Sequence, residues 1–237
     1  MRATGTGSSP LLHEYRVVAL DLRGHGRSGW ASEGAYGIED YAGDLARAVD
    51  SVLGGGARRR ALVGHSMGAL ASMVYASRHS DRLWATVFID IDPRPPDRQH
   101  ERLHAAGQRP ARVFASLGEV EAGIDRLTPG LPGAVVAMLA AQGFTQTEGG
   151  YTQRMDQRTL AEFPQVDNRP LLPSISVPAM VVRGDKSMVS SLDGATEAAA
   201  SLPQGRLVLV DGEHQVHIQH PEALAAVLTP FLGASAH

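Results

Sequence analysis

The chain has 237 residues, of which 43% are hydrophobic, an ordinary content for a soluble globular protein. The length fits one large domain, or a domain with an inserted cap. The formal net charge of −3 gives no electrostatic reason to expect nucleic acid or a membrane surface as a partner. The absence of cysteine excludes disulfides, thiol catalysis and thiolate metal sites, and it suits a reducing compartment. Residues 1–15 lack the apolar core of a signal peptide and no apolar run could span a bilayer, so we expect a cytoplasmic protein.

Short apolar runs alternate with helical patterns along the chain. Such continuous runs are typical of strands that helices cover on both faces. Apolar spacings of three and four predict a helix from Ile38 to Val52, and further helices are expected after Ser66 and from Pro221 onward. The predicted fold class is therefore α/β, with a mostly parallel sheet flanked by helices. The expected strands span residues 16–21, 60–64, 86–91, 179–183 and 206–210.

The stretch from residue 93 to residue 173 breaks this rhythm. It is rich in proline and charge, and it is too long for a plain loop. Spaced apolar residues predict one helix over residues 113–127 and another over residues 131–139, with a turn or short hairpin at residues 143–151. We therefore expect a helical cap at 93–173, inserted into a core made of residues 11–92 and 174–237.

Gly64-His65-Ser66-Met67-Gly68 forms a G-x-S-x-G pentapeptide. It lies between an apolar run that predicts a strand and a small, apolar helical pattern. In that context a tight turn projects the serine hydroxyl out of the backbone, and the flanking glycines avoid a side-chain clash. The pattern predicts Ser66 as a nucleophile; the alternative is a merely structural glycine turn.

A serine nucleophile needs a base, and the base needs an orienting acid. Of the ten histidines, His214 follows directly after the apolar run that ends at Val210. Catalytic groups in open α/β sheets gather at the carboxyl ends of strands, so His214 is the predicted base. His217 and His220 are expected at the surface or in packing. His65 adjoins the nucleophile and is the predicted substrate-binding residue.

Together these motifs resemble the α/β-hydrolase family. Residues 21–28 read Asp-Leu-Arg-Gly-His-Gly-Arg-Ser and resemble the family's D-x-R-G-x-G-x-S segment, which shapes a loop without a catalytic role. Residues 64–68 resemble the nucleophile elbow, and residues 212–221 resemble the histidine loop with its following helix. The resemblance covers nearly the whole chain after residue 11, apart from the cap. It implies that the five expected strands are the family's fourth to eighth.

The position of the acid stays open among three aspartates. The family usually carries it after the seventh strand, where this chain has Ser187 in the usual position and Asp185 two residues earlier. The sixth strand ends in Asp90-Ile91-Asp92-Pro93, which resembles small serine esterases with the acid in a D-I-x-P segment. This favours Asp90, with Asp185 and Asp92 as alternatives. A carboxylate inside an apolar strand requires partners, so Asp90 either orients the histidine or is satisfied by backbone amides.

The resemblance also implies an oxyanion hole with two backbone N–H donors. One is the Met67 N–H, and the other usually follows the family's third strand. Only fifteen residues precede the run at 16–21, and residues 5–10 do not have the composition to replace three strands. We therefore expect either a chain that starts late relative to the functional gene product or a degenerate hydrolase. The strand at 16–21 then pairs with the strand at 60–64, pairs with a second copy in a homodimer, or is loosened; the first two are favoured, the homodimer more.

The resemblance implies a serine hydrolase that cleaves a small ester, thioester or lactone through an acyl-serine, with no metal or organic cofactor. Its partner is then a small-molecule substrate. Two alternatives remain: a lyase on the same fold, and a binding protein with little or no catalytic activity. The expected lack of a second oxyanion donor strengthens the second alternative.

Overall fold

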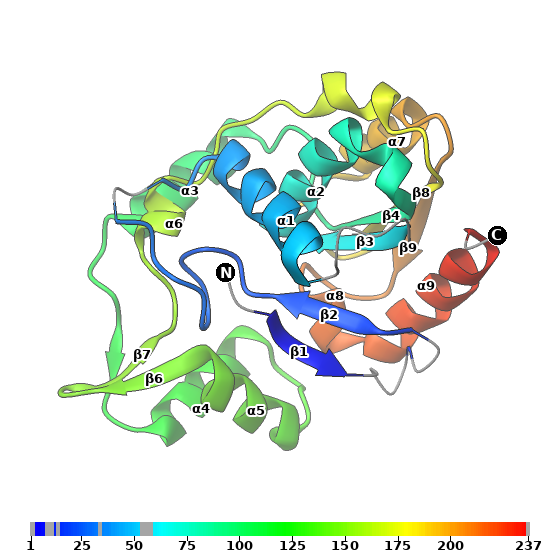
Figure 1. Cartoon of the computed structure of the whole chain (residues 1–237). Coiled ribbons are helices and arrows are strands. Elements are labelled where there is room, and N and C mark those ends of the chain that lie inside the picture. Colours follow the sequence, from blue (N-terminus) through cyan, green and yellow to red (C-terminus); the bar gives the residue numbers. More distant parts are fainter. Residues whose placement is uncertain (1–2, 8–11, 13–14, 33–34, 53–58, 236–237) are drawn as a thin grey trace.

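The computed structural model describes residues 3–7, 12, 15–32, 35–52 and 59–235. At its centre lies a parallel sheet of four strands in the order β3-β4-β8-β9 (Figure 1). Each of these strands corresponds to an expected apolar run, and their carboxyl ends meet at one edge of the sheet. The strands are β3 (Arg60–His65), β4 (Leu83–Ile89), β8 (Ala179–Gly184) and β9 (Gly205–Val210).

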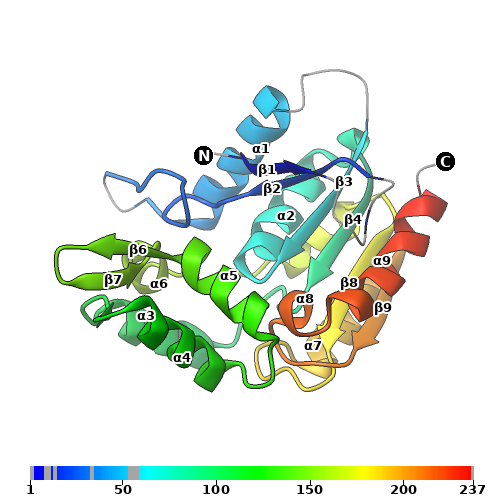
Figure 2. The same ribbon diagram turned by 90° about the horizontal axis from the view of Figure 1, so that it is seen from below.

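Helices cover both faces of this sheet, as the α/β prediction requires (Figures 1 and 2). One face packs against α1 (Ile38–Val52), α2 (Met67–Arg78) and α7 (Leu192–Ser201). The other packs against α8 (Val216–Gln219) and α9 (Pro221–Ser235). Alternate residues of β4 supply the two cores: Phe88 faces the first group of helices, whereas Val87 and Ile89 face the second. No helix in the described part of the chain is long and apolar enough to cross a bilayer.

The spacing of apolar residues accounts for the two helices nearest the nucleophile. On α1, the buried side chains Tyr41, Leu45 and Val49 recur at intervals of four and form one face. Helix α2 is buried throughout from Ala69 to Ala76, because it lies between the sheet and other helices. A helix with neighbours on several sides carries apolar residues all round. The 3-10 turn η1 (Ser80–Arg82) then leads into β4.

The N-terminal strand differs from the expectation. Strand β2 (Val17–Leu20) forms a separate two-stranded antiparallel ribbon with β1 (Ala3–Gly7), and Gly5 faces Ala19 in the register. The predicted pairing of the strand at 16–21 with the strand at 60–64 is therefore wrong. The expectation that no strand precedes residue 16 is wrong as well, because residues 3–7 form a strand that pairs with one edge of β2. The homodimer stays a prediction.

The segment between β4 and β8 combines helices with a small antiparallel sheet in the order β5-β7-β6. The small sheet with α4 and α5 lies to one side of the parallel sheet, and the predicted hairpin is present as β6 and β7 (Figures 1 and 2). The end of the segment instead packs in the core, where Phe163 and Leu172 are buried with residues of α2. The elements are α3 (Asp97–Gly107), β5 (Val113–Phe114), α4 (Leu117–Leu127), α5 (Gly133–Gly143), β6 (Phe144–Thr147), β7 (Gly150–Gln153), α6 (Arg158–Ala161) and the 3-10 helix η2 (Arg169–Ser174).

The first helix predicted in this segment begins four residues later than expected. Ser116 caps α4, because its hydroxyl accepts the Glu119 N–H at 3.2 Å, while the Glu119 carboxylate accepts the N–H of Ala115 at 3.0 Å. This pair ends the extended chain before Leu117. Val113 therefore lies in β5, paired with β7, and not on the helix.

The loop at residues 21–28 joins the insertion to the core. Gly24 and Gly26 have φ values of +73° and +55°, and a Cβ on either would collide with neighbouring side chains. The Gly26 N–H donates to the Arg154 carbonyl at 2.8 Å, and the Gly24 carbonyl accepts the Asp156 N–H at 2.8 Å. The buried Tyr36 hydroxyl donates to the Asp156 carboxylate at 2.6 Å. These contacts agree with the architectural role predicted for this loop.

Candidate active site

Ser66 lies at the turn between β3 and α2. Its φ of +52° and ψ of −121° fall outside the regions that residues with a side chain usually occupy. The Ser66 N–H donates to the Ile89 carbonyl at 3.0 Å, and its carbonyl accepts the N–H groups of Ala69 and Leu70. The backbone on both sides therefore holds this conformation. Strained residues of this kind gather at functional sites, so the turn has the geometry predicted for a nucleophile elbow.

The two glycines of the pentapeptide differ in what requires them. A Cβ on Gly64 would lie 2.5 Å from the Gly68 carbonyl oxygen and 2.6 Å from the Ser72 hydroxyl. Only glycine allows β3 to approach α2 this closely. A Cβ on Gly68 would meet nothing within 4 Å. The predicted steric requirement therefore applies to Gly64, whereas at Gly68 the structure shows open space.

His214 follows β9 and contacts Asp90, which follows β4. The distance from His214 Nδ1 to Asp90 Oδ2 is 2.8 Å. The Asp90 side chain is fully shielded from solvent and the His214 side chain is 24% exposed. A carboxylate oxygen only accepts, so Nδ1 carries the proton and Nε2 keeps a free lone pair, as a general base requires. The predicted contact between this carboxylate and the His214 ring is confirmed.

Two further groups hold the Asp90 carboxylate. Its Oδ1 accepts the Gly184 N–H at 2.9 Å, and its Oδ2 accepts the Ser187 hydroxyl at 2.6 Å. The Ser187 oxygen itself accepts two backbone N–H groups, which leaves its own proton for the carboxylate. The backbone at Asp90 has a φ of +52°; among the described residues other than glycine, only Ser66 shares this feature. Asp90 thus has the imidazole and the backbone amide as partners at the same time.

The alternative acids have other partners. Asp185 Oδ1 accepts the N–H of Gly212 at 2.9 Å, so it holds the backbone of the histidine loop and not the ring of His214. Asp92 accepts the Ser190 hydroxyl at 2.9 Å, together with the N–H and hydroxyl of Ser191 at the start of α7. Of the three aspartates, the structure brings Asp90 alone to the imidazole.

Two adjacent residues of β8, Arg183 and Gly184, bring the histidine loop and the acid together. The sequence predicted a role for neither. A Cβ on Gly184 would lie 2.4 Å from the Glu213 carbonyl oxygen, so glycine lets the loop approach the end of the strand. The buried Arg183 donates to the carbonyls of Ser190, Asp185 and Ser187 at 3.0–3.1 Å and fixes the turn that carries Ser187. The sequence did offer a signal for Arg183: an arginine at the end of an apolar strand is expected to be buried, and a buried cation requires acceptors nearby.

His65 faces the histidine loop. Its Nε2 lies 2.8 Å from the carbonyl oxygen of His214, and its ring centroid lies 4.5 Å from those of His214 and His217. Burial first, and then the two neighbouring imidazoles, lower the pKa of His65 to about 3. His217 was expected at the surface or in packing. It is exposed to solvent, and its ring also contacts the ring of His65. The predicted contact of His65 with a substrate stays a prediction.

Met67 begins α2, and its N–H is the predicted oxyanion donor. The first N–H groups of a helix have no intrahelical acceptor and form the positive end of its dipole. Ala69 and Leu70 donate to the Ser66 carbonyl, whereas among the described residues the N–H of Met67 has no acceptor. Within the same residues the Ser66 hydroxyl makes no hydrogen bond. Both groups are therefore available to a bound molecule.

A sequence profile described as "Alpha/beta hydrolase family" matches residues 5–227 of this chain. The chain belongs to this family. An α/β-hydrolase carries its reactive groups at the carboxyl ends of its strands, where Ser66, Asp90 and His214 lie. The predicted fold class is thereby confirmed.

Relatives of this α/β-hydrolase match it over most of their length. The 2-(acetamidomethylene)succinate hydrolase of Mesorhizobium japonicum is 28% identical over 228 residues, which cover 94% of this chain and 81% of that protein. Esterase YbfF of Escherichia coli is 25% identical over 230 residues, covering 96% and 87%. The crystal structure of E-2-(acetamidomethylene)succinate hydrolase superposes with a TM-score of 0.80 at 27% identity, covering 91% and 81%. The similarity therefore includes both the core and the insertion.

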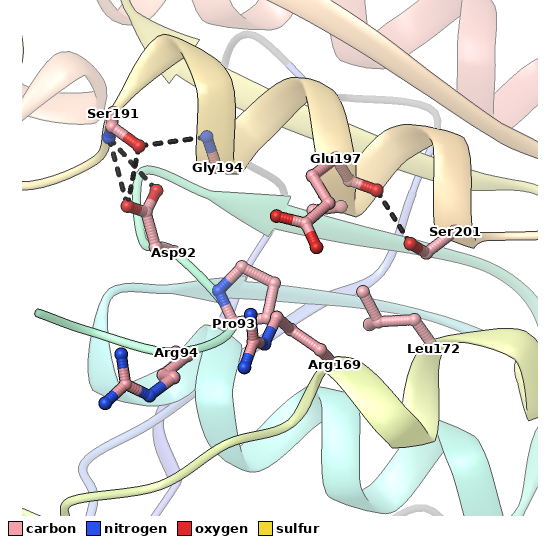
Figure 3. Close-up of a pocket in the computed structure, with 10 residues that line it drawn as sticks. Asp92, Pro93, Arg94, Arg169, Leu172, Ser191, Gly194, Glu197 and Ser201 are labelled. Carbon is pink, nitrogen blue, oxygen red and sulfur yellow. Dashed lines mark hydrogen bonds between the residues drawn. The ribbon is translucent and has the colours of Figure 1, made fainter.

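A cavity of about 200 Å³ lies between α7 and η2, and Asp92 forms part of its wall (Figure 3). Its wall includes Leu172 and the partly exposed Arg94 and Arg169, whereas Ser66 and His214 do not line it. Both guanidinium groups already pair with nearby aspartates. The cavity is therefore separate from the candidate active site of the α/β-hydrolase.

Proposed function

We propose that this chain is a serine hydrolase that cleaves a small ester, thioester or lactone through an acyl-serine intermediate. The observation that carries the proposal is the positive-φ turn at Ser66, on the same sheet edge as a histidine paired with a buried aspartate. The similarity to proteins named as a hydrolase and an esterase supports the class of reaction. The partner of the site is then a small-molecule substrate that carries an acyl group.

In the first step, Ser66 Oγ attacks the carbonyl carbon while its proton passes to Nε2 of His214. Asp90 accepts the Nδ1–H, which fixes the tautomer and stabilises the imidazolium that forms. The Met67 N–H donates to the developing oxyanion at the positive end of α2. Collapse of the tetrahedral intermediate breaks the bond to the leaving group, which takes the proton from Nε2.

In the second step, water attacks the acyl-serine and His214 again accepts a proton. The same N–H stabilises the second tetrahedral intermediate, and Ser66 leaves with the proton from Nε2. These steps use no metal and no organic cofactor. Residues 93–173 act in this proposal as a cap whose contacts with the loop at 21–28 hold it beside the core.

The test combines p-nitrophenyl acetate turnover with labelling by a serine-directed fluorophosphonate. We expect the wild type to be labelled at Ser66 and to hydrolyse the ester, and Ser66→Ala to lose both while keeping its far-UV circular dichroism spectrum. Activity falls toward acidic pH, because a protonated imidazole does not accept the serine proton. Labelling that survives in Ser66→Ala contradicts the assignment. A folded wild type that shows neither labelling nor turnover favours a binding protein.

A further inference from the structure

His65 joins two segments that lie 149 residues apart in the chain. One is the turn that carries Ser66, to which His65 is bonded directly. The other is the loop that carries His214, whose carbonyl oxygen lies 2.8 Å from His65 Nε2. A carbonyl oxygen only accepts, so Nε2 of His65 carries the proton and the hydrogen bond has a fixed direction. The candidate nucleophile and the candidate base are therefore linked through this side chain.

Two ring contacts restrict the same side chain. The centroid of the His65 ring lies 4.5 Å from the centroids of both His214 and His217, with interplanar tilts of 40° and 53°. His217 belongs to the short helix α8, which follows the histidine loop. Rotation of the His65 ring would break the hydrogen bond and both contacts at once. The side chain thus has one orientation that allows all three contacts with His214 and His217.

The three imidazoles do not form a metal site. Nδ1 of His214 donates to Asp90 and Nε2 of His65 donates to a carbonyl, so each ring has only one nitrogen left that could bind a metal ion. Within the described part of the chain, no group of three histidine, cysteine or acidic side chains is arranged to hold a metal ion. The cluster therefore needs an explanation other than ligation.

The electrostatic state of His65 suits a supporting role. Burial and the imidazoles of His217 and His214 lower its pKa, against the opposite but weaker effect of Asp90. His65 is consequently neutral wherever the proposed reaction runs. A second cation at this distance would repel a proton arriving on His214, and a neutral ring does not.

We infer that His65 is a positioning residue, which holds the His214 backbone, and with it the imidazole, at a fixed place beside Ser66. The inference rests on the proposed serine hydrolase and replaces the predicted contact between His65 and substrate with a contact to the base. Small misplacements of catalytic groups reduce turnover without weakening substrate binding. Loss of the hydrogen bond from His65 should therefore lower kcat and leave KM nearly unchanged.

Two substitutions separate the hydrogen bond from the ring contacts. His65→Gln keeps an N–H donor at a similar reach, whereas His65→Phe keeps the ring and loses the donor. With p-nitrophenyl acetate, we expect His65→Phe to lower kcat about tenfold with KM within twofold of wild type. His65→Gln should keep most of kcat. A higher KM at unchanged kcat in both variants would overturn the inference and return His65 to substrate binding.

A second readout does not depend on turnover. Proton NMR of the wild type should show a downfield resonance from the His214 Nδ1–H that donates to Asp90, assigned by its loss in Asp90→Asn. We expect this resonance to persist in His65→Gln and to broaden or disappear in His65→Phe. An unchanged resonance in folded His65→Phe overturns the positioning role, even if Ser66 is labelled normally. Absence of labelling and turnover in the wild type, with the expected NMR change, would count against the proposed function alone.

Discussion

The acid side and the nucleophile side of the candidate site are built by different forces. On the acid side, side-chain and backbone donors surround Asp90: the imidazole of His214, the Ser187 hydroxyl and the Gly184 N–H. On the nucleophile side, Ser66 is held by backbone hydrogen bonds and by the close packing of Gly64. A buried carboxylate requires several donors, whereas a partly exposed hydroxyl requires none. Hydrogen bonds to the carboxylate therefore hold the acid and its histidine, whereas backbone hydrogen bonds and close packing hold the nucleophile.

The sheet reflects the same difference. Asp90 follows β4, an interior strand whose described neighbours lie on both sides. Ser66 follows β3, the last strand of the four, where Val63 is 44% exposed. A low-dielectric interior strengthens the hydrogen bonds of the acid, and the edge position leaves the serine accessible. Substitutions on the acid side should thus change activity first, whereas substitutions in the packing around the turn, such as at Gly64, should change stability first.

The largest expected effect is on the acid. Asp90→Asn offers its amide to His214 in place of a carboxylate, so the imidazole loses the charge that stabilises its protonated form. We expect kcat/KM for p-nitrophenyl acetate to fall about 10³–10⁴-fold with the fold intact. Asp185→Asn is the matched control, because its amide oxygen still accepts the Gly212 N–H. An equal loss of kcat/KM in Asp90→Asn and Asp185→Asn would show that contact with the His214 ring does not identify the catalytic acid.

Packing dominates the next prediction. Gly64→Ala places a methyl group within 2.5 Å of the Gly68 carbonyl oxygen and 2.7 Å of the Ala69 Cα, and neither backbone atom moves easily. We expect a loss of about 2–3 kcal/mol in the free energy of unfolding, measured by urea denaturation. Gly68→Ala, in open space on a helix, should leave stability unchanged or raise it by about 0.5–1 kcal/mol. Equal destabilisation of both variants would contradict the steric difference.

Much of this architecture follows from apolar periodicity. The pattern from Ile38 to Val52 and the runs that became β3, β4, β8 and β9 are recognisable because burial on one or both faces determines their composition. Strand β1 was missed for the opposite reason. Its sequence, Ala-Thr-Gly-Thr-Gly, lacks an apolar run. The strand pairs through backbone hydrogen bonds, which leave no recognisable pattern of side chains in the sequence.

The candidate site divides in the same way. Strand ends brought Ser66, Asp90 and His214 to one edge, so their proximity was predictable. The direction of the His65 ring was not, because it depends on the course of the histidine loop. That course is set by Gly212 with a φ of +132° and by the room that Gly184 leaves. Such loop geometry arises from contacts between distant segments and leaves little trace in local sequence.

A smaller change on the acid side is the loss of one donor. Ser187→Ala removes the hydroxyl 2.6 Å from Asp90 Oδ2 but leaves the imidazole and the Gly184 N–H in place. We expect about a tenfold fall in kcat/KM, because a hydrogen bond to a charged group is worth about 1.5–3 kcal/mol and part of it is replaced by water. Ser174→Ala is the control, since that exposed hydroxyl bonds only the Leu171 carbonyl. An unchanged kcat/KM in Ser187→Ala would mean that this donor does not orient the acid.

The smallest effect concerns pH and lies between the two sides, at His65. Its pKa is lowered to about 3 in the folded chain, by burial and by the neighbouring imidazoles, whereas an unfolded histidine titrates near 6.5. Between these values the unfolded chain binds a proton that the folded chain excludes, so folding stability falls as the pH decreases from about 6.5 toward 3. His65→Gln has no such proton. From pH 7.5 to pH 5, the free energy of unfolding of the wild type should therefore fall by roughly 1–2 kcal/mol more than that of His65→Gln, as measured by urea denaturation at both pH values. Equal decreases in the two proteins would mean that His65 is free to take up its proton in the folded chain, and the ring would then be loosely held where the structure has it enclosed.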